Sequence, residues 1–205
     1  MSQFSRPSSN VEASSWYGDY FDIDEVAPSD ADYIYASDSS NGYITLSLSS
    51  VNVPESGTHT VRFRAWQENN SKQRTLVVQL LQGTTVISEY NGGAAFNLVK
   101  GTSTSYSWTL SSGEISNITD YTALRVKFIS GGDVGAPAKN QAYAYVSWME
   151  YELPDAGSSD QLTSQDVTSG VAVVDKPGLD QNHSLSSQDV TSGVPNVDKP
   201  TATTF

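Results

Sequence analysis

The alternation of apolar and polar residues along the first three quarters of the chain is typical of β-strands. Within 58–66, apolar residues occupy every second position from Val61 to Ala65, and arginines stand between them. The same period of two runs through 43–51 and 123–129. Successive side chains of a strand point to opposite faces, so these segments predict a sheet with one buried face and one face towards solvent.

Further strands are predicted where β-branched and aromatic residues gather between turn residues. No stretch shows a convincing helical period. Several short strands at this spacing, without helices, indicate an all-β antiparallel sandwich of jelly-roll type. The remaining predicted strands are Tyr33–Ala36, Arg74–Leu81, Thr84–Tyr90, Tyr106–Leu110 and Gln141–Leu153.

The distribution of aromatic residues divides the chain into three parts. Nineteen of the 21 Phe, Trp and Tyr residues lie between Trp16 and Tyr151. Large aromatic side chains supply much of the stability of a core. We therefore expect an N-terminal arm over 1–11, a folded body over 12–153 and an extended tail over 154–205. The tail is rich in Ser, Thr, Asp, Val, Gly and Pro, a composition that cannot offset the entropy of ordering.

Composition excludes several classes of partner. The net charge is −12 and cysteine is absent. An acidic chain without clustered Lys and Arg disfavours nucleic acid and an anionic membrane surface. No apolar run reaches membrane-spanning length, and the start MSQFSRPSSN lacks the apolar stretch of a secretory signal. We expect neither a disulfide framework nor a thiolate zinc site.

The tail contains one phrase twice. Residues 162–177 and 185–200 are identical at 13 of 16 positions, with SQDVTSGV unchanged in both copies. A flexible linker constrains composition but not the order of residues, so this retention favours docking of each copy into the same kind of groove. Equal ligands imply equal receptors, as in a symmetric assembly. The predicted partner-binding residues are Leu162, Val167, Val171, Val174, Pro177, Leu185, Val190, Val194, Val197 and Pro200.

Catalytic residues are weakly indicated. The chain has two histidines, His59 and His183, and no serine with the glycine pattern of a nucleophile elbow. Glu150 and Glu152 share one face of a predicted strand and resemble a carboxylate pair, but nothing marks either one as the acid. We therefore expect no enzymatic activity.

A calcium site is a possible function of the acidic segment near the start. Eight acids and no base lie between Glu12 and Asp38. Calcium takes several carboxylate and carbonyl oxygens, although the glycine and spacing of an EF-hand loop are absent. The alternative is an acidic edge that discourages aggregation between sheets. The candidate ligands are Asp19, Asp22, Asp24 and Glu25.

Carbohydrate binding is another possible function, because flat aromatic rings stack on pyranose rings. The competing role for each ring is packing in the core. The candidate residues are Trp16, Tyr17, Trp66, Trp108 and Tyr143.

Two parts of the sequence support a resemblance to a known class of protein. The tandem phrase of the tail resembles repeats in structural proteins of tailed bacteriophages. YVSWMEYELP at 145–154 and YFDIDE at 20–25 are similar to jelly-roll domains of such virion proteins. The tail departs from the usual phrase, since Ala172 stands where proline is expected in the first copy.

The resemblance implies a non-enzymatic virion protein, made in the host cytoplasm. The leading hypothesis is a decoration protein on the capsid exterior, as a homotrimer. Its arm and tail would clamp neighbouring subunits of the major capsid protein or other virion proteins. The alternative is a carbohydrate-binding module of a phage tail or head fibre, with the tail as its attachment segment.

Overall fold

The structure is a computed structural model that describes residues 2–37, 41–133 and 142–156. All of these residues lie in one compact unit, Met1–Ser158. Both copies of the repeat, and with them all the predicted partner-binding residues, lie outside the described residues. In the described ranges no helix is long and apolar enough to cross a membrane.

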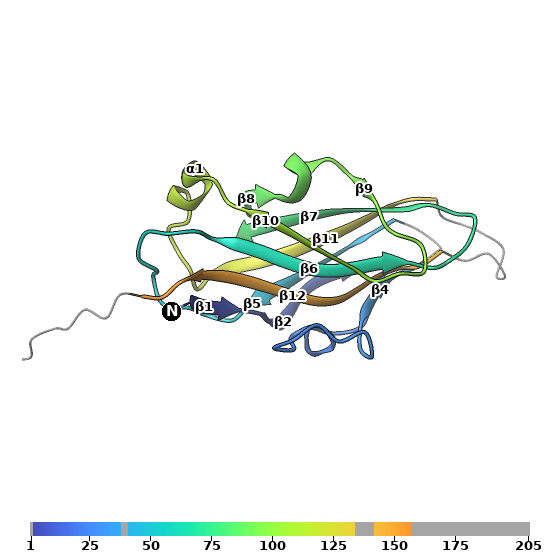
Figure 1. Cartoon of the computed structure of the whole chain (residues 1–205), viewed down its shortest axis with the longest axis horizontal. Helices are drawn as coiled ribbons and strands as arrows, with labels where there is room; N and C mark the ends of the chain where they lie inside the picture. Colours follow the sequence, from blue (N-terminus) through green and yellow to red (C-terminus); the bar gives the residue numbers. More distant parts are fainter. Residues whose placement is uncertain (1, 38–40, 134–141, 157–205) are drawn as a thin grey trace, which may run out of the picture. The chain divides into compact units, whose positions relative to one another are not determined.

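Two antiparallel sheets form the body (Figure 1). Sheet A has the order β10-β6-β12-β4-β3. Strand β4 pairs with the beginning of β12, and β1 pairs with its end. The strands of sheet A are β1 (Ser2–Ser5), β3 (Trp16–Tyr17), β4 (Ile34–Ala36), β6 (Thr60–Gln67), β10 (Thr104–Thr109) and β12 (Ala144–Pro154).

Sheet B packs face to face against sheet A. Its order is β2-β5-β11-β7-β8, and β9 pairs with β7. The strands of sheet B are β2 (Pro7–Ser14), β5 (Tyr43–Leu48), β7 (Arg74–Gln82), β8 (Thr85–Glu89), β9 (Phe96–Asn97) and β11 (Leu124–Gly132).

The core lies between the two sheets and is built by the predicted alternation. Val61, Phe63 and Ala65 of β6 are fully buried, while the residues between them are half-buried. Phe63 meets Phe128 of β11 with ring centroids 6.2 Å apart. Such contacts between alternate residues of two facing sheets define a β-sandwich. The structure thus confirms the predicted all-β fold.

Short helices were not predicted. The described ranges contain two 3₁₀-helices, η1 (Tyr20–Asp22) and η2 (Tyr90–Gly93), and one α-helix, α1 (Ser112–Ser116). Helix α1 begins with a capping box in which the Ser111 hydroxyl accepts from the Glu114 amide and the Glu114 carboxylate accepts from the Ser111 amide. A helix of five residues is too short to show a helical period, but the Ser-x-x-Glu spacing of its capping box is visible in the sequence.

Residues 2–11 of the segment predicted as an N-terminal arm over 1–11 pair with strands of the sandwich. Strand β1 pairs with β12 from Ser2↔Pro154 to Ser5↔Tyr151, and β2 pairs with β5. Backbone groups that would stay exposed in an arm are thereby paired within both sheets. Such pairing is invisible in composition, because polar residues dominate both strands.

Strand β12 contains a β-bulge at Ser147 that changes which side chains face outward. Val146 pairs with Ala65 and Trp148 pairs with Arg64, so Ser147 is the extra residue. Tyr145 before the bulge and Trp148 after it therefore lie on the same outer face. Unbroken alternation would have placed Trp148 in the core.

Residues 18–32, here called the strap, cover this outer face beyond the bulge and are drawn as the blue loop below β4 in Figure 1. Trp148 donates from Nε1 to the Glu25 carbonyl at 2.8 Å, and the Met149 amide donates to the Ile23 carbonyl at 3.3 Å. The strap buries Ile23 completely and Trp148 almost completely. The outer face of β12 beyond the bulge is therefore partly covered by the strap.

Candidate ligand-binding face

Four aromatic residues form one row across the outer face of sheet A. Tyr17 of β3 is the register partner of Tyr35 of β4, Tyr35 is the partner of Tyr145 of β12, and Tyr145 is the partner of Trp66 of β6. Directly opposed residues of an antiparallel pair lie on the same face of the sheet. We call Tyr17, Tyr35, Tyr145 and Trp66 the aromatic row.

The rings of the aromatic row follow one another closely. Tyr17 and Tyr35 are stacked with centroids 5.2 Å apart and an interplanar angle of 21°. Tyr35 and Tyr145 are 6.2 Å apart and tilted by 40°. Tyr145 and Trp66 are 5.0 Å apart at 14°. Offset stacking of this kind stabilises aromatic pairs beyond the burial of their area, so the row is held together by its own contacts.

Two further tyrosines border the row, one on each long side. Tyr33 directly precedes β4, two residues before Tyr35. Its ring stands edge-on to that of Tyr145, with centroids 5.1 Å apart and an interplanar angle of 86°. It also meets Trp66 edge-on at 5.9 Å. Tyr143 lies two residues before Tyr145 and contacts Tyr35 at 5.6 Å and 90°. We call the row together with Tyr33 and Tyr143 the aromatic face.

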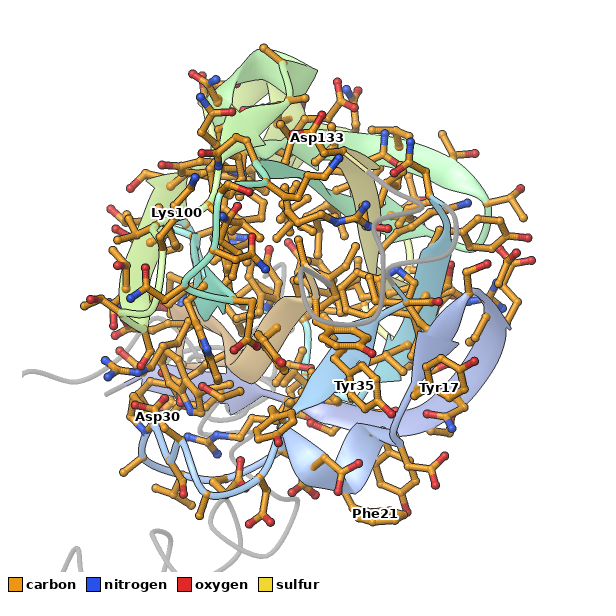
Figure 2. The ribbon with its side chains drawn as sticks, turned by 90° about the vertical axis from the view of Figure 1, so that its right-hand side faces the viewer. Tyr17, Phe21, Asp30, Tyr35, Lys100 and Asp133 are labelled. Atoms are coloured by element: carbon orange, nitrogen blue, oxygen red, sulfur yellow. The ribbon has the colours of Figure 1, made fainter. Side chains whose placement is uncertain are left out.

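The aromatic face is open to solvent at its end on β3. Tyr17 is 54% exposed and Tyr33 is 40% exposed, while the other four rings are half-buried. Figure 2 shows Tyr17 beside Tyr35 on the side of the body that faces the viewer. Clustered exposed aromatic surface on a folded domain marks a site of interaction.

A network centred on Asp30 fixes the end of the strap beside Tyr33. Asp30 accepts from Arg64 Nε and Nη2, each at 2.8 Å, and from the hydroxyls of Ser103 at 2.6 Å and Ser147 at 2.9 Å. Hydrogen bonds from the Arg64 guanidinium, followed by those of the two hydroxyls, outweigh desolvation and lower the pKa of Asp30 strongly. The carboxylate is therefore ionised at all physiological pH values, and Arg64 is neutralised by it.

Glu68 supplies a carboxylate at the other flank. The Tyr145 hydroxyl donates to Glu68 Oε2 at 2.7 Å, and Glu68 itself is exposed. Burial, and then the neighbouring Glu68, raise the pKa of Tyr145, so its hydroxyl keeps its proton. Fixed donors and acceptors therefore stand on both long sides of the rings.

Three of the five aromatic residues predicted for carbohydrate binding lie on this face, namely Tyr17, Trp66 and Tyr143. Two do not. Trp16 is 7% exposed and packs against Phe128 at 6.3 Å. Trp108 packs on the core side of β10, and its Nε1 donates to the Ser88 hydroxyl at 2.9 Å. Both are held by the core.

Sequence reasoning missed Tyr33, Tyr35 and Tyr145. The signal was present as two Tyr-x-Tyr pairs, Tyr33–Tyr35 and Tyr143–Tyr145, because residues two apart on a strand share a face. The pairing of β4 with β12 then brings the two pairs together.

Two of the four calcium candidates, Asp19 and Asp22, bond to each other's backbone around η1. Asp19 caps η1, and the Asp22 carboxylate accepts from the Asp19 amide at 2.8 Å. Across the described ranges, no three His, Cys, Asp or Glu side chains are placed so that they could hold a metal ion. Glu25 has a raised pKa, mainly through burial. The expected convergence of Asp19, Asp22, Asp24 and Glu25 is thus not found.

The weak catalytic candidates are also in structural roles. His59 is 1% exposed, and its Nδ1 lies 2.6 Å from the Tyr151 hydroxyl. Glu150 is paired with Arg6 and lies 3.6 Å from Arg62, which also pairs with Glu152. His183 lies outside the described residues. The two glutamates are therefore compensated by arginines rather than aimed at a common substrate.

A pocket of about 430 Å³ lies at the opposite end of sheet A, away from the aromatic face. It is lined by Ser2, Thr58, Thr60, Arg62, Glu152 and Pro154. No aromatic ring lines it, and its charged pair is already satisfied internally. The aromatic face is the stronger candidate site because it gathers six rings, two of which, Tyr17 and Tyr33, are exposed.

Comparison by sequence finds no matching family model and no matching curated protein. Comparison of structures finds distant similarities. The C-terminal CBM6 of a marine laminarinase from Zobellia galactanivorans is 12% identical, with a TM-score of 0.39 over 74% of this chain and 98% of that one. A family 29 carbohydrate-binding module from Piromyces equi is 14% identical, with a TM-score of 0.38 over 75% and 92%.

A third similar structure is the enzymatically active domain of tailspike protein 4 from bacteriophage CBA120. It is 10% identical, with a TM-score of 0.34 over 73% of this chain and 19% of that chain. Similarities of this size are limited to the general arrangement of strands. The chain is an antiparallel β-sandwich by its own two sheets, and these likenesses assign it neither a ligand nor a family.

Proposed function

We propose that the body is a non-enzymatic carbohydrate-binding module and that sugars bind on the aromatic face. The observation that carries this proposal is the aromatic row, in which Tyr17, Tyr35, Tyr145 and Trp66 are direct register partners across four strands. Rings brought together from distant parts of the chain, with exposed members at one end, form a surface rather than a core.

The chemistry of the face suits a sugar. A pyranose presents C–H groups on its faces and hydroxyls around its rim. The faces of aromatic rings carry partial negative charge and attract the weakly positive C–H groups. Glu68 and the Asp30–Arg64 network stand beside the rings, where they can exchange hydrogen bonds with the hydroxyls of the rim. Ligand sites commonly combine an apolar, aromatic surface with a few polar groups in fixed positions.

The composition of the row also differs from that of a permanent interface with another protein. The row contains no aliphatic side chain, and three of its four rings carry a hydroxyl. An interface that is buried permanently is more hydrophobic and resembles a core cut in half. The aromatic face therefore fits a hydroxyl-rich ligand that binds reversibly.

The capsid-decoration hypothesis stays a separate prediction. It rests on the duplicated phrase at 162–177 and 185–200, which lies outside the described residues. In the proposal made here, the body binds carbohydrate, and the tail serves as an attachment segment, as in a phage tail or head fibre. Deleting 157–205 would then abolish association with the particle and leave sugar binding unchanged.

Binding to immobilised glycans, followed by titration calorimetry, tests the proposal. Replacement of Trp66 by Ala or of Tyr33 by Ala should weaken binding roughly tenfold, because each removes one aromatic contact. The matched control is Phe4→Ala, which removes an exposed ring from β1, 43% exposed and opposite Glu152. Each variant is first compared with the wild-type chain by circular dichroism.

Two outcomes would contradict the proposal. One is the absence of binding to any glycan by a folded chain. The other is a change of molecular mass in solution on Trp66→Ala, since the aromatic face would then be the contact between copies of the chain.

A further inference from the structure

The direction of the aromatic row carries an inference about the ligand, which rests on the proposed function. We infer that the ligand is an extended neutral polysaccharide whose sugars are linked through equatorial bonds at opposite positions of each ring, as in a β-1,4-linked chain. It lies along the row, across the strands, with one sugar over each of the four strands.

The spacing of the strands in the sheet sets the spacing of the rings along the row. Neighbouring strands lie about 4.8 Å apart, so four register-paired residues extend over about 14 Å. The steps between ring centroids are 5.2 Å, 6.2 Å and 5.0 Å from Tyr17 to Trp66. A ligand that contacts every ring must therefore repeat at close to the strand spacing and keep one direction.

An extended β-1,4-linked chain meets both conditions. Each of its sugars advances the chain by one six-membered ring and one bridging oxygen, a length close to one strand spacing. Because both bridging bonds are equatorial and stand at opposite positions of the ring, the chain stays straight and its rings stay flat. An α-1,4-linked or β-1,3-linked chain bends at each link and leaves a straight row after one or two sugars.

The ends and flanks of the row agree with a polymer rather than a single sugar. Tyr17 lies on β3, the edge strand of sheet A, and is 54% exposed, so among the described residues the row ends at an exposed ring. Tyr33 and Tyr143 border the long sides only. A chain can therefore run off the open end.

Charge along the flanks favours a neutral chain. Glu68 presents an exposed carboxylate next to Tyr145. Arg64, which stands two residues before Trp66 on the same face, is neutralised by two hydrogen bonds to Asp30. Carboxylates at each sugar would meet repulsion from Glu68 without gaining the Arg64 charge.

Length dependence is the first test. Titration calorimetry uses the full chain with β-1,4-linked gluco-, manno- and N-acetylglucosamine oligomers of two to six sugars. α-1,4-linked and β-1,3-linked glucose oligomers of the same lengths serve as comparisons. For at least one β-1,4-linked series, affinity should rise up to four sugars and then level off. The bent oligomers should bind at least roughly tenfold more weakly, since they lose contact with one or more rings.

A variant at the open end gives the second test. Tyr17→Ala should weaken binding of the tetrasaccharide roughly tenfold, because it removes one stacking contact. Binding of the trisaccharide should stay unchanged, because it can occupy the other three positions. Tyr17→Phe keeps the ring and should retain tetrasaccharide binding.

The outcomes separate this inference from the proposed function. If glycans bind but bent oligomers bind equally well, or no step separates three sugars from four, the inference is wrong and the proposed function stands. Equal weakening of both oligomers by Tyr17→Ala would also overturn it. If a folded chain binds no glycan, the proposed function itself fails.

Discussion

Asp30 illustrates how one side chain can organise a surface from several strands. It ties the strap to β6 through Arg64, to β12 through Ser147 and to the segment before β10 through Ser103. These bonds need the ionised carboxylate, and they are the cause of its lowered pKa. A depressed pKa in the folded state contributes stability above the unfolded value, near 3.9, and that contribution is lost as pH falls.

We predict that Asp30→Asn lowers the free energy of unfolding by about 1 kcal/mol at neutral pH, a value kept small because the side chain is 40% exposed. The difference between the variant and the wild-type chain should shrink below pH 4. Urea denaturation at several pH values measures this. Asp32→Asn, an exposed acid of the same strap, is the control, and an equal effect there would contradict the assignment.

His59 is the other residue from which a pH dependence is expected. Burial lowers the pKa of its imidazole, and its Nε2 is buried without a hydrogen-bond partner. The unfolded chain takes up the proton near pH 6.5, whereas the folded chain resists it. Stability is therefore complete above that pH and is lost as pH falls towards the lower folded value.

Urea denaturation between pH 7.5 and about pH 5 should thus show a falling free energy of unfolding, within the range where histidine titrates. His59→Gln should lower stability at neutral pH but remove most of this slope. His183→Gln, in the tail, should keep the slope. A slope that survives in His59→Gln would assign the titration to another group.

At the level of elements, the strands of the sandwich were predictable because burial follows alternation. Leu124, Val126 and Phe128 are buried as their period of two requires. Strands β1 and β2 were not predictable, since Ser2–Ser5 and Pro7–Ser14 carry few apolar residues. Their pairing depends on partners at least 29 residues away, from Ser14↔Tyr43, and composition does not indicate it.

The aromatic row shows the same limit for the site. Tyr17 and Trp16 are neighbours, and alternation requires them to face opposite ways without saying which one faces the core. Trp66 and Tyr145 meet because β6 pairs with β12 in one register. A shift by one residue would move either ring into the core. Candidate rings can therefore be chosen from sequence, but the row cannot.

The bulge at Ser147 sets that register, which leads to a prediction for the element. Deletion of Ser147 would remove the extra residue and make Val146↔Ala65 and Trp148↔Arg64 consecutive pairs, so both halves of β12 would keep their facing. We expect a cooperative thermal transition by circular dichroism at a lower temperature than in the wild-type chain, because the local bend and the hydrogen bond to Asp30 are lost. Ser147→Ala keeps the bulge and should lose only about 1 kcal/mol with its hydrogen bond to Asp30. A deletion variant as stable as Ser147→Ala would contradict a structural role of the bulge.

For the whole molecule, the net charge of −12 sets which glycans can approach. A like-charged polymer is repelled over about 8 Å at physiological ionic strength, and over longer distances at low salt. We predict that polyuronates and sulfated glycans do not bind in low salt, and that affinity for a neutral glycan hardly changes with salt. Calorimetry at two ionic strengths measures both, and salt-sensitive binding of an anionic glycan would contradict the prediction.

The pairing of Ser2 with Pro154 has one more consequence. The first and last described strands meet at the same end of sheet A, beside each other in Figure 1. Tyr145 lies nine residues earlier on β12, about 30 Å away along the strand. Ser2 and Pro154 therefore stand at one end of sheet A, and the aromatic face stands at the other. A fluorescent or immobilising label attached at Ser2 would lie far from the aromatic face, so binding could be measured on the labelled chain.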